Sequence, residues 1–302
     1  MTLNQLRTFL AVAETGSVRA AAQQLVVTQA AVSASLAALQ KSLGVPLLQP
    51  DGRGLRLTSA GQAYAGYVRR ILGLLDEAGL AATAAADPER GELRIAAVTT
   101  AAEQIVPGLL RGFRSRHPRM GVRLEAGNRD RVRALLDRHQ VDLVLGGRPE
   151  PGWDVRVLAV RPHQLVVVAA PGLAADATPG PGLVPWLARQ AWLLREPGSG
   201  TRAATDALLT DLDIAPLTLM VGSNGAIRES ASVGLGVTLI SRDAVAAELA
   251  DGRLRELPLP GTPLHRDWYL VAHHTLPLAG ERLVEHVLSH GGFQSPTVNP
   301  GL

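Results

Sequence analysis

The first 58 residues carry a succession of helices and turns that most constrains what this chain can fold into. Apolar residues at the start recur three and four positions apart, as on one buried helix face, and Gly16 ends this helix. Ser17 is placed to cap a second helix that ends near Leu25, and Thr28 to cap a third. The inward face of the third helix is expected to consist of Val32, Leu36, Leu39 and Leu43.

Small and polar residues lie on the outward face of this third helix, at its N-terminal end. In a helix-turn-helix, these positions of the second motif helix reach base edges in the major groove. Glutamine can bond adenine bidentately, serine adapts to several bases, and alanine can contact the methyl group of thymine. The residues expected to meet DNA here are Thr28, Gln29, Ala30, Ser33 and Ala34. A solvated helix in an ordinary bundle would show the same pattern, so three helices alone leave both interpretations open.

A two-stranded wing is predicted after the third helix. Residues 44–48 read as a strand, a tight turn follows, and residues 55–57 read as the return strand. Arg53 and Arg56 then lie where a wing meets phosphates, and such contacts position a protein on the duplex without reading its sequence.

The segment from Met1 to Gly61 resembles the winged helix-turn-helix of LysR-type transcriptional regulators. The matching phrases are LNQLRTFLAVAETGSVRAAAQQLVVTQAAVSASLAALQKSLGVPLL and RLTSAG. Two positions depart from the family, which often has a basic or long polar residue where this chain has Ala34, and an arginine where it has Pro50. Fewer phosphate contacts predict weaker DNA binding with a shallower salt dependence. The affinity is then expected to depend more on having several subunits.

The charge of the chain is concentrated in the same segment. Residues 1–58 contain five basic and two acidic side chains, and the resulting +3 equals the net charge of the whole chain. The remainder is balanced, although the isoelectric point near 9.9 reflects a preference for arginine. This distribution fits a nucleic-acid partner for the N-terminal segment and implies none for the rest.

Residues 59–86 form a heptad seam over more than three heptads. Its members are Ala60, Tyr64, Tyr67, Ile71, Leu74, Ala78, Ala81 and Ala85. Ser59 and Gln62 make a capping box, and residues 87–91 end the helix. The seam predicts dimerisation through Tyr64, Tyr67, Ile71 and Leu74; the alternative is packing against the chain's own C-terminal part. A twofold dimer would present two reading helices to half-sites about 34–36 Å apart, or a multiple of that.

Strands and helices alternate from Glu92 onward, which predicts a mostly parallel sheet with right-handed crossovers. The expected strands are 93–98, 122–126, 143–146, 165–170, 191–195, 218–221, 237–240 and 265–273. The expected helices are 101–116, 129–139, 201–212, 224–233 and one around Leu283. This order predicts two α/β lobes, with a binding cleft beyond the carboxyl ends of the strands.

Three strand-to-helix junctions carry hydroxyls, amides or glycines where a ligand would lie. They are Thr99-Thr100, Ser199-Gly200-Thr201-Arg202 and Ser223-Asn224. Free backbone N–H groups and the helix dipole favour anions at such positions, and Arg202 adds a full charge. Ordinary helix capping uses the same residue types, but the convergence of three junctions favours a site for a carboxylate or a phosphate.

The same region resembles the effector-binding domain of LysR-type regulators, which has the architecture of periplasmic solute-binding proteins. RLEAGNRDRVRALL, VDLVLGGRPE, REPGSGTR and GSNGAIRESASVGLGVTLISR are most similar to the branch that controls carbon-fixation and cysteine-biosynthesis operons. The resemblance extends from Met1 to about Gly291. It implies effector contacts from Thr99, Thr100, Ser199, Thr201 and Arg202, with Asn128, Arg148 and Asn224 also in the cleft.

No pattern in the chain indicates catalysis. The absence of cysteine excludes thiol chemistry, disulfides and cysteine-ligated zinc. Gly198-Ser199-Gly200 lacks the full G-x-S-x-G spacing, and no P-loop is present. His273 and His274 project to opposite faces if they lie in a strand, so they cannot share a metal there. We therefore predict no enzymatic activity, no metal and no cofactor.

The predicted domains are a winged helix-turn-helix at 1–58, a linker and dimerisation helix with a hinge at 59–90, and an effector-binding domain at 91–302. Lobe I would comprise about 91–161 and 267–291, and lobe II about 162–266. Met1 begins an amphipathic helix rather than a signal peptide, and no apolar run reaches the roughly 18 residues of a spanning helix. A cytoplasmic location is expected.

Together these features predict a sequence-specific transcriptional regulator controlled by a small anionic metabolite bound between the lobes. Its expected partners are double-stranded promoter DNA, the effector, further copies in a homodimer or homotetramer, and RNA polymerase, with no membrane. The ligand must bind one arrangement better than another, with hinging near Arg161-Pro162 and Arg266-Asp267. One alternative is an architectural DNA-binding protein with a vestigial cleft. The other is a solute-binding protein, which would need an export signal and would have no use for a winged helix.

Overall fold

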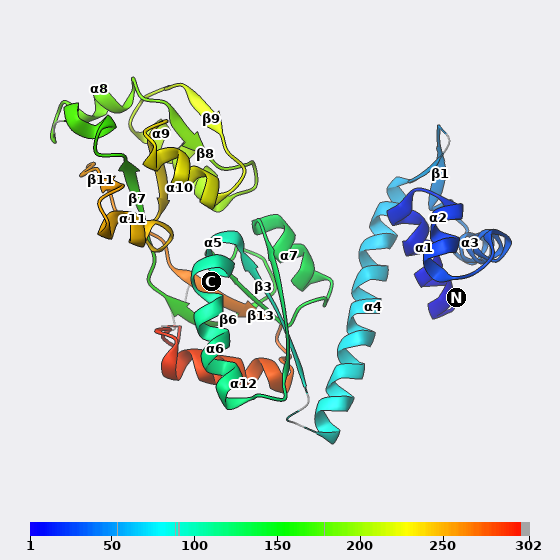
Figure 1. The fold of residues 1–302 in the computed structure, drawn as a ribbon. Helices are drawn as coiled ribbons and strands as arrows, with labels where there is room; N and C mark the ends of the chain where they lie inside the picture. The colour runs from blue at the N-terminus through cyan, green and yellow to red at the C-terminus, as the bar shows by residue number, and fades with distance from the viewer. Residues whose placement is uncertain (53, 88, 90, 178, 297–302) are drawn as a thin grey trace. The chain divides into compact units, whose positions relative to one another are not determined.

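The computed structural model describes residues 1–52, 54–87, 89, 91–177 and 179–296 (Figure 1). The chain divides into two compact units. The first comprises Met1–Ala82 together with Asp137–Gln140, and the second comprises Thr83–Leu136 and the chain from Val141 onward. Each unit has its own hydrophobic core.

The first unit begins with the three predicted helices, α1 (Leu3–Thr15), α2 (Val18–Leu25) and α3 (Gln29–Leu43). Their N-caps are Thr2, Ser17 and Thr28, whose side chains each accept a hydrogen bond from a backbone N–H of the first turn. Gly16 ends α1 at φ 66°, in the left-handed conformation that glycine adopts without strain. Phe9, Val12 and Leu39 are fully buried where the three helices meet.

The wing consists of β1 (Leu48–Asp51) and β2 (Gly54–Leu57), an antiparallel pair with Leu48 opposite Leu57. The first strand begins four residues later than predicted. At this start, the side-chain oxygen of Gln40 accepts hydrogen bonds from the N–H groups of Leu47 and Leu48 at 2.7 and 3.2 Å. These bonds fasten the segment at the start of β1 to α3.

The long helix α4 runs from Ser59 to Ala86 as predicted, but its cap differs from the prediction. The hydroxyl oxygen of Thr58 accepts a hydrogen bond from the N–H of Gly61 at 2.9 Å, so Thr58 caps the helix rather than Ser59. Ala65 and Val68 are fully buried in the core of the first unit. The start of α4 is therefore part of the winged-helix core.

The predicted seam of α4 is divided between two environments. The ring of Tyr64 lies 5.4 Å from that of Phe9 and packs on the core of its own unit. Tyr67, Ile71 and Leu74 are 65%, 43% and 52% exposed. An apolar strip formed by these three residues thus remains on the helix surface, and its role in dimerisation stays a prediction.

Lobe I of the second unit is built on a five-stranded sheet in the order β4-β3-β5-β13-β6. The strands are β3 (Glu92–Val98), β4 (Gly121–Gly127), β5 (Leu143–Gly146), β6 (Arg156–Arg161) and β13 (Trp268–Ala272). Its helices are α5 (Thr99–Gln104), α6 (Val106–Arg116), α7 (Arg129–Asp137) and α12 (Leu278–His290). β3 is parallel to β4 and β5, whereas β13 is antiparallel to both of its neighbours. The helix predicted at 101–116 is in fact two helices divided at Ile105.

Lobe II contains two smaller sheets and shorter helices. Its strands are β7 (Gln164–Ala169), β8 (Trp192–Leu194), β9 (Thr218–Met220), β10 (Thr238–Ser241), β11 (Arg255–Glu256) and β12 (Leu264–His265). Its helices are α8 (Leu183–Leu187), α9 (Gly200–Asp211), α10 (Asn224–Ser232) and α11 (Ala246–Ala250), with 3₁₀ turns η1 (Leu173–Asp176) and η2 (Arg242–Val245). β8 and β9 are parallel, but β7 is antiparallel to β10, β11 and β12. The predicted mostly parallel arrangement is therefore wrong for the sheet around β7.

The chain passes between the lobes twice, at the two places predicted for hinging. The first passage joins β6 to β7 through residues 162–163, and the second joins β12 to β13 through residues 266–267. In Figure 1 the orange strand β13 returns to the sheet of lobe I after the chain has completed lobe II. This return explains why β13 runs antiparallel to its neighbours.

None of the helices in the described part of the chain is by itself long and apolar enough to cross a membrane. The pair α2 and α3, which is bent by 107°, passes the same length and composition test only when the two are taken together.

Val26 is a strained position at the turn between α2 and α3. Its φ of 56° lies in the left-handed region, which β-branched residues rarely adopt. Its side chain is 89% exposed, so packing contacts do not offset the backbone strain. Val26→Asn should therefore raise the free energy of unfolding of the first unit by about 1 kcal/mol. Urea unfolding of the full chain measures this, with Val27→Asn as the control that changes a neighbouring valine without a left-handed backbone. A Val26→Asn chain less stable than wild type would contradict the assignment of strain.

Candidate functional site

The N-terminal half of α3 presents the predicted DNA-contacting residues to solvent. Gln29, Ala30, Ser33 and Ala34 are exposed, whereas the opposite face of the helix is buried in the core. The hydroxyl oxygen of Thr28 accepts a hydrogen bond from the N–H of Ala31 at 3.2 Å, which fixes the start of the helix. These side chains are available to a duplex, and their contacts with DNA stay a prediction.

On the wing, the side chain of Arg56 is exposed on β2, opposite Gln49 on β1. Arg53, the other predicted phosphate contact, lies outside the described residues.

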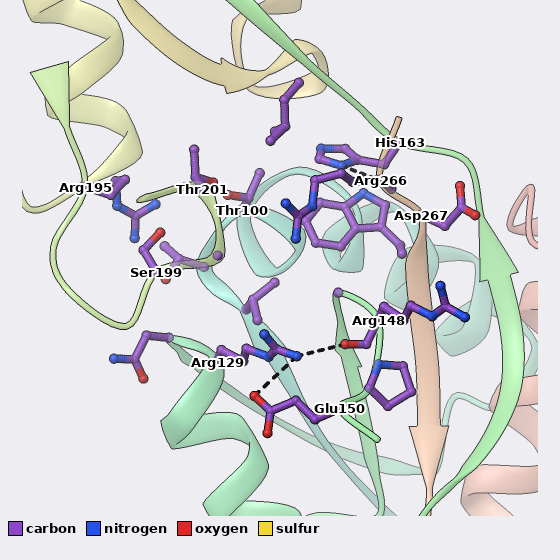
Figure 2. Close-up of a pocket in the computed structure, with 18 of the residues that line it drawn as sticks. Thr100, Arg129, Arg148, Glu150, His163, Arg195, Ser199, Thr201, Arg266 and Asp267 are labelled. Carbon is purple, nitrogen blue, oxygen red and sulfur yellow. Dashed lines mark hydrogen bonds and ion pairs between the residues drawn. The ribbon is translucent and has the colours of Figure 1, made fainter. Parts of the chain in front are cut away.

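The second unit contains a cavity of about 290 Å³ lined by residues from both lobes (Figure 2). β3, β4 and β5 end at its wall, as expected for a site beyond the carboxyl ends of strands. The predicted effector residues that line it are Thr99, Thr100, Asn128, Arg148, Ser199, Gly200 and Thr201. The structure thus brings together residues that lie up to 102 positions apart in the sequence.

The N-terminus of α9 forms one wall of the cavity. The first N–H groups of this 12-residue helix, on Gly200 and Thr201, have no hydrogen-bond acceptor among the described residues. Ser199 precedes them, 8% exposed, and its hydroxyl makes no hydrogen bond to any described residue. Unpaired donors and the positive end of a helix dipole at one wall favour a ligand with anionic oxygens.

Four arginines and two acids line the cavity. Arg129 lies 3.5 Å from the Glu150 carboxylate and donates a hydrogen bond to the backbone oxygen of Arg148 at 3.0 Å, as Figure 2 shows. Arg148 and Arg266 form no ion pair with any residue that the structure describes, and both are exposed. Positive charge therefore exceeds negative charge around the cavity, which again favours an anion.

Arg195 is the buried arginine of this wall, only 4% exposed, and it directly follows β8. Its Nε and Nη2 donate hydrogen bonds to the two carboxylate oxygens of Glu196 at 2.7 and 2.8 Å, and its Nη1 donates to the side-chain oxygen of Asn224. Burial raises the pKa of the Glu196 carboxyl, but the hydrogen bonds from Arg195 and the backbone and the nearby positive charge together outweigh burial. The pKa of Glu196 is therefore lowered, and Arg195 faces a carboxylate at neutral pH.

Asn224 lies behind the cavity wall. Its side-chain nitrogen donates to the hydroxyl oxygen of Thr100 at 2.8 Å and, more weakly, to the Glu103 carboxylate at 3.4 Å. Because Asn224 opens α10 in lobe II and Thr100 lies in α5, this amide bonds the two lobes to each other.

Arg202, which was predicted to bring a charge to the site, does not line this cavity but lies at an adjoining hollow, so its effector contact stays a prediction. Its Nε lies 2.8 Å from both carboxylate oxygens of Asp206, one helical turn further along α9. An acid four residues away on the same helix face holds the guanidinium against the helix. The hollow that Arg202 lines adjoins the cavity and shares residues with it, and Arg195 supplies a buried guanidinium at the cavity wall.

Several lining residues were missed by the sequence interpretation. They are Arg129, Glu150, His163, Arg195, Arg266, Asp267 and Trp268. Two signals were available: Arg195 ends a predicted strand, and His163 and Arg266 lie at the predicted lobe passages. None of these three residues is a hydroxyl residue, an amide or a glycine, so the pattern of the strand-to-helix junctions does not include them.

His163 joins the two lobe passages. Its Nδ1 lies 3.0 Å from the backbone oxygen of Arg266, its Nε2 lies 2.9 Å from the Ser241 hydroxyl, and its ring centroid is 4.2 Å from that of Trp268. Burial lowers the pKa of His163; Asp243 and the backbone bond to Arg266 raise it, less strongly. The imidazole is therefore neutral at neutral pH, with Nδ1–H donating to the carbonyl and Nε2 accepting from the hydroxyl.

The lowered pKa of His163 makes the stability of the second unit dependent on pH. The unfolded chain binds a proton here at a pKa of about 6.5, so the stabilisation is present above that pH. It is lost as the pH falls from there through the lower pKa of the folded state. The free energy of unfolding should thus fall from pH 7.5 to pH 5.5, and it should fall less in His163→Gln, which keeps a donor and an acceptor. Urea unfolding at both pH values measures this, and an equal fall in both proteins would contradict it.

Two family models match the chain. The model of the bacterial regulatory helix-turn-helix protein of the lysR family matches residues 3–62, and the model of the LysR substrate binding domain matches residues 86–292. Among curated proteins, the HTH-type transcriptional regulator CbbR of Xanthobacter flavus is 35% identical over 310 residues, with 99% of this chain and 91% of that protein covered. The RuBisCO operon transcriptional regulator of Acidithiobacillus ferrooxidans is 36% identical over 272 residues, covering 89% of this chain and 87% of that protein.

Solved structures agree with this match. Full-length CbnR in complex with its target DNA is 25% identical, with a TM-score of 0.69, and covers 96% of this chain and 99% of that one. The regulatory domain of Synechocystis PCC6803 CcmR in complex with 2-PG is 26% identical, with a TM-score of 0.59, and covers 66% of this chain and 97% of that one.

Proposed function

Since the chain belongs to the LysR family of bacterial transcriptional regulators, we propose that it reads promoter DNA with α3 and responds to a small anionic metabolite bound in the cavity. The observation that carries this proposal is the composition of the cavity wall. Unbonded hydroxyl and N–H donors at the start of α9 share the cavity lining with four arginines and only two acids. An anion with several oxygens satisfies these donors better than water or a neutral solute does.

We propose further that the regulated genes serve carbon fixation and that the effector is an anion, as 2-PG is. The names of the relatives support the first part, since one is a regulator of a RuBisCO operon. The CcmR regulatory domain supports the second, because it was solved in complex with 2-PG. The donor set of the present cavity fits the same chemical class.

Control requires that the metabolite bind one arrangement of the lobes better than another, because equal affinity for both would shift nothing. The cavity draws on both lobes, and the two passages at residues 162–163 and 266–267 are the connections about which they can turn. The proposed effect is a change in the placement of the DNA-binding segments within an oligomer.

The proposed oligomer is a homodimer or homotetramer that uses the exposed strip of Tyr67, Ile71 and Leu74 on α4. Three large apolar side chains on one exposed stretch of helix favour burial against a second copy. RNA polymerase is a further proposed partner at the promoter, and the proposed location is the cytoplasm, where promoter DNA is accessible.

DNA reading by α3 is tested by removing its two polar side chains at the exposed end. Gln29→Ala/Ser33→Ala should weaken binding to the DNA upstream of the protein's own gene by about tenfold to hundredfold, because each good base contact contributes about 1–3 kcal/mol. Footprinting and mobility shift of the full chain measure this, with Ser42→Ala near the opposite end of the same helix as the control. Unchanged protection by the double variant would refute the assignment of the reading face.

The effector role of the α9 wall is tested by Ser199→Ala/Thr201→Val. This variant removes two hydroxyls from the cavity and should abolish the change that 2-PG produces in the footprint, while the footprint without ligand stays as in wild type. Thr210→Val is the matched control, because Thr210 lies in the same helix and donates its hydroxyl to the backbone of Asp206 instead. A double variant that still responds would exclude this wall as the binding surface. A wild-type protein indifferent to 2-PG and to other phosphorylated or carboxylated metabolites would favour an architectural DNA-binding protein.

A further inference from the structure

Arg195 has hydrogen-bonding capacity that the protein itself does not use. A guanidinium carries five N–H groups, and three of those on Arg195 donate to Glu196 and Asn224. The remaining two, one on Nη1 and one on Nη2, have no acceptor in the part of the chain that the structure describes. Since Arg195 also lines the cavity, these two N–H groups can bind two oxygens of one ligand group.

Burial distinguishes Arg195 from the other arginines of the cavity. Arg148 and Arg266 are exposed, so water screens their charges, and Arg129 already bonds to Glu150 and to a backbone oxygen. Arg195 is 4% exposed, and a hydrogen bond to a charged group is stronger where water is excluded. Figure 2 shows Arg195 beside Ser199 and Thr201, so its donors lie on the same wall as the start of α9.

Asn224 fixes the orientation of this guanidinium. The two ends of its amide have different partners: the oxygen accepts from Arg195, and the nitrogen donates to Thr100 and Glu103. Asn224 is itself 4% exposed and opens α10, where the Ser223 hydroxyl oxygen caps the helix by accepting a hydrogen bond from Ala226 N–H at 3.1 Å. Its amide therefore has little freedom to turn.

We propose that Arg195 binds the anionic group of the effector and that Asn224 is the positioning residue that aims Arg195. This inference deepens the proposed function and rests on the proposed anionic effector. A carboxylate or phosphate accepts two hydrogen bonds from the spare N–H groups of Nη1 and Nη2, and the hydroxyls of Ser199 and Thr201 complete the contacts. Through Thr100 the same amide holds this guanidinium in register with the wall of lobe I.

Glu196 sets the net charge that the ligand meets. Its carboxylate holds the Nε side of Arg195 and neutralises part of the positive charge without lining the cavity itself. Glu196→Gln keeps an oxygen that can accept from Arg195 and removes the opposing charge. Anions should therefore bind severalfold more tightly to this variant, whereas a change at Arg195 should act in the opposite direction.

The test is calorimetric titration of the full-length protein with 2-PG and, separately, with inorganic phosphate. Arg195→Gln should weaken 2-PG binding by about ten- to hundredfold, as expected for the loss of hydrogen bonds to a charged group. Arg195→Lys keeps the charge but loses the paired donors and should be intermediate. Arg253→Gln is the matched control, since it removes a lobe II arginine that does not line the cavity and whose guanidinium bonds to Asp251, and it should bind as wild type does.

The role of Asn224 is tested by a double-mutant cycle. Asn224→Ala should weaken 2-PG binding by about three- to tenfold in the wild-type background, and it should have little further effect in Arg195→Gln. A residue that merely stabilises the fold would weaken binding equally in both backgrounds. Thermal unfolding of each variant without ligand establishes that the proteins compared are folded.

The outcomes separate this inference from the proposed function. If wild type binds 2-PG and Arg195→Gln and Arg195→Lys bind it equally well, the assignment of Arg195 is overturned while the anionic effector stands. Additive effects of Asn224→Ala and Arg195→Gln would overturn the positioning role alone. If wild type binds neither 2-PG, phosphate nor any other anionic metabolite tried, the proposed anionic effector fails and the inference fails with it.

Discussion

The double passage of the chain between the lobes is the constraint on which the rest of the second unit depends. The passages are held together by the backbone N–H of Arg266, which donates to the oxygen of His163 at 2.8 Å, and by the His163 ring, which bonds back to the oxygen of Arg266. Trp268 packs on that ring. Because the two passages are fastened to each other here, the lobes are joined along one edge, and the cavity lies beside that edge. Turning of the lobes about this edge is part of the proposed mechanism.

A cavity at this place collects its residues from distant parts of the sequence. Lobe I supplies the ends of three parallel strands, and lobe II supplies the start of α9 and the buried Arg195. The side chain of Asn224 in lobe II bonds directly to Thr100 and Glu103 in lobe I. A ligand seated between the walls adds contacts to both lobes at once, so its binding energy depends on their separation.

The local elements could be predicted from the sequence because their signals are local. Gly16 ends the first helix, and Ser17 and Thr28 cap the second and third. Hydroxyl residues mark the strand-to-helix junctions that line the cavity. The antiparallel course of β13 could not be predicted, since it depends on where the chain re-enters lobe I. The place of Arg195 in the cavity wall could not be predicted either, since its burial follows from how β8 and α10 pack.

The surface of α3 places a limit on how a single subunit can hold DNA. Its exposed N-terminal half carries alanines, a serine and a glutamine, and its first charged residue is Lys41 in the last turn. Such a face can distinguish bases but contributes little of the phosphate neutralisation that supplies most of the affinity for DNA. Joining two or more such faces turns the second binding event into an intramolecular one, which raises the affinity without any new contact. An uncharged exposed half of α3, together with an exposed apolar strip on α4, is therefore consistent with a protein whose affinity for DNA depends on its assembly. A ligand that alters the spacing of the subunits would then alter DNA binding.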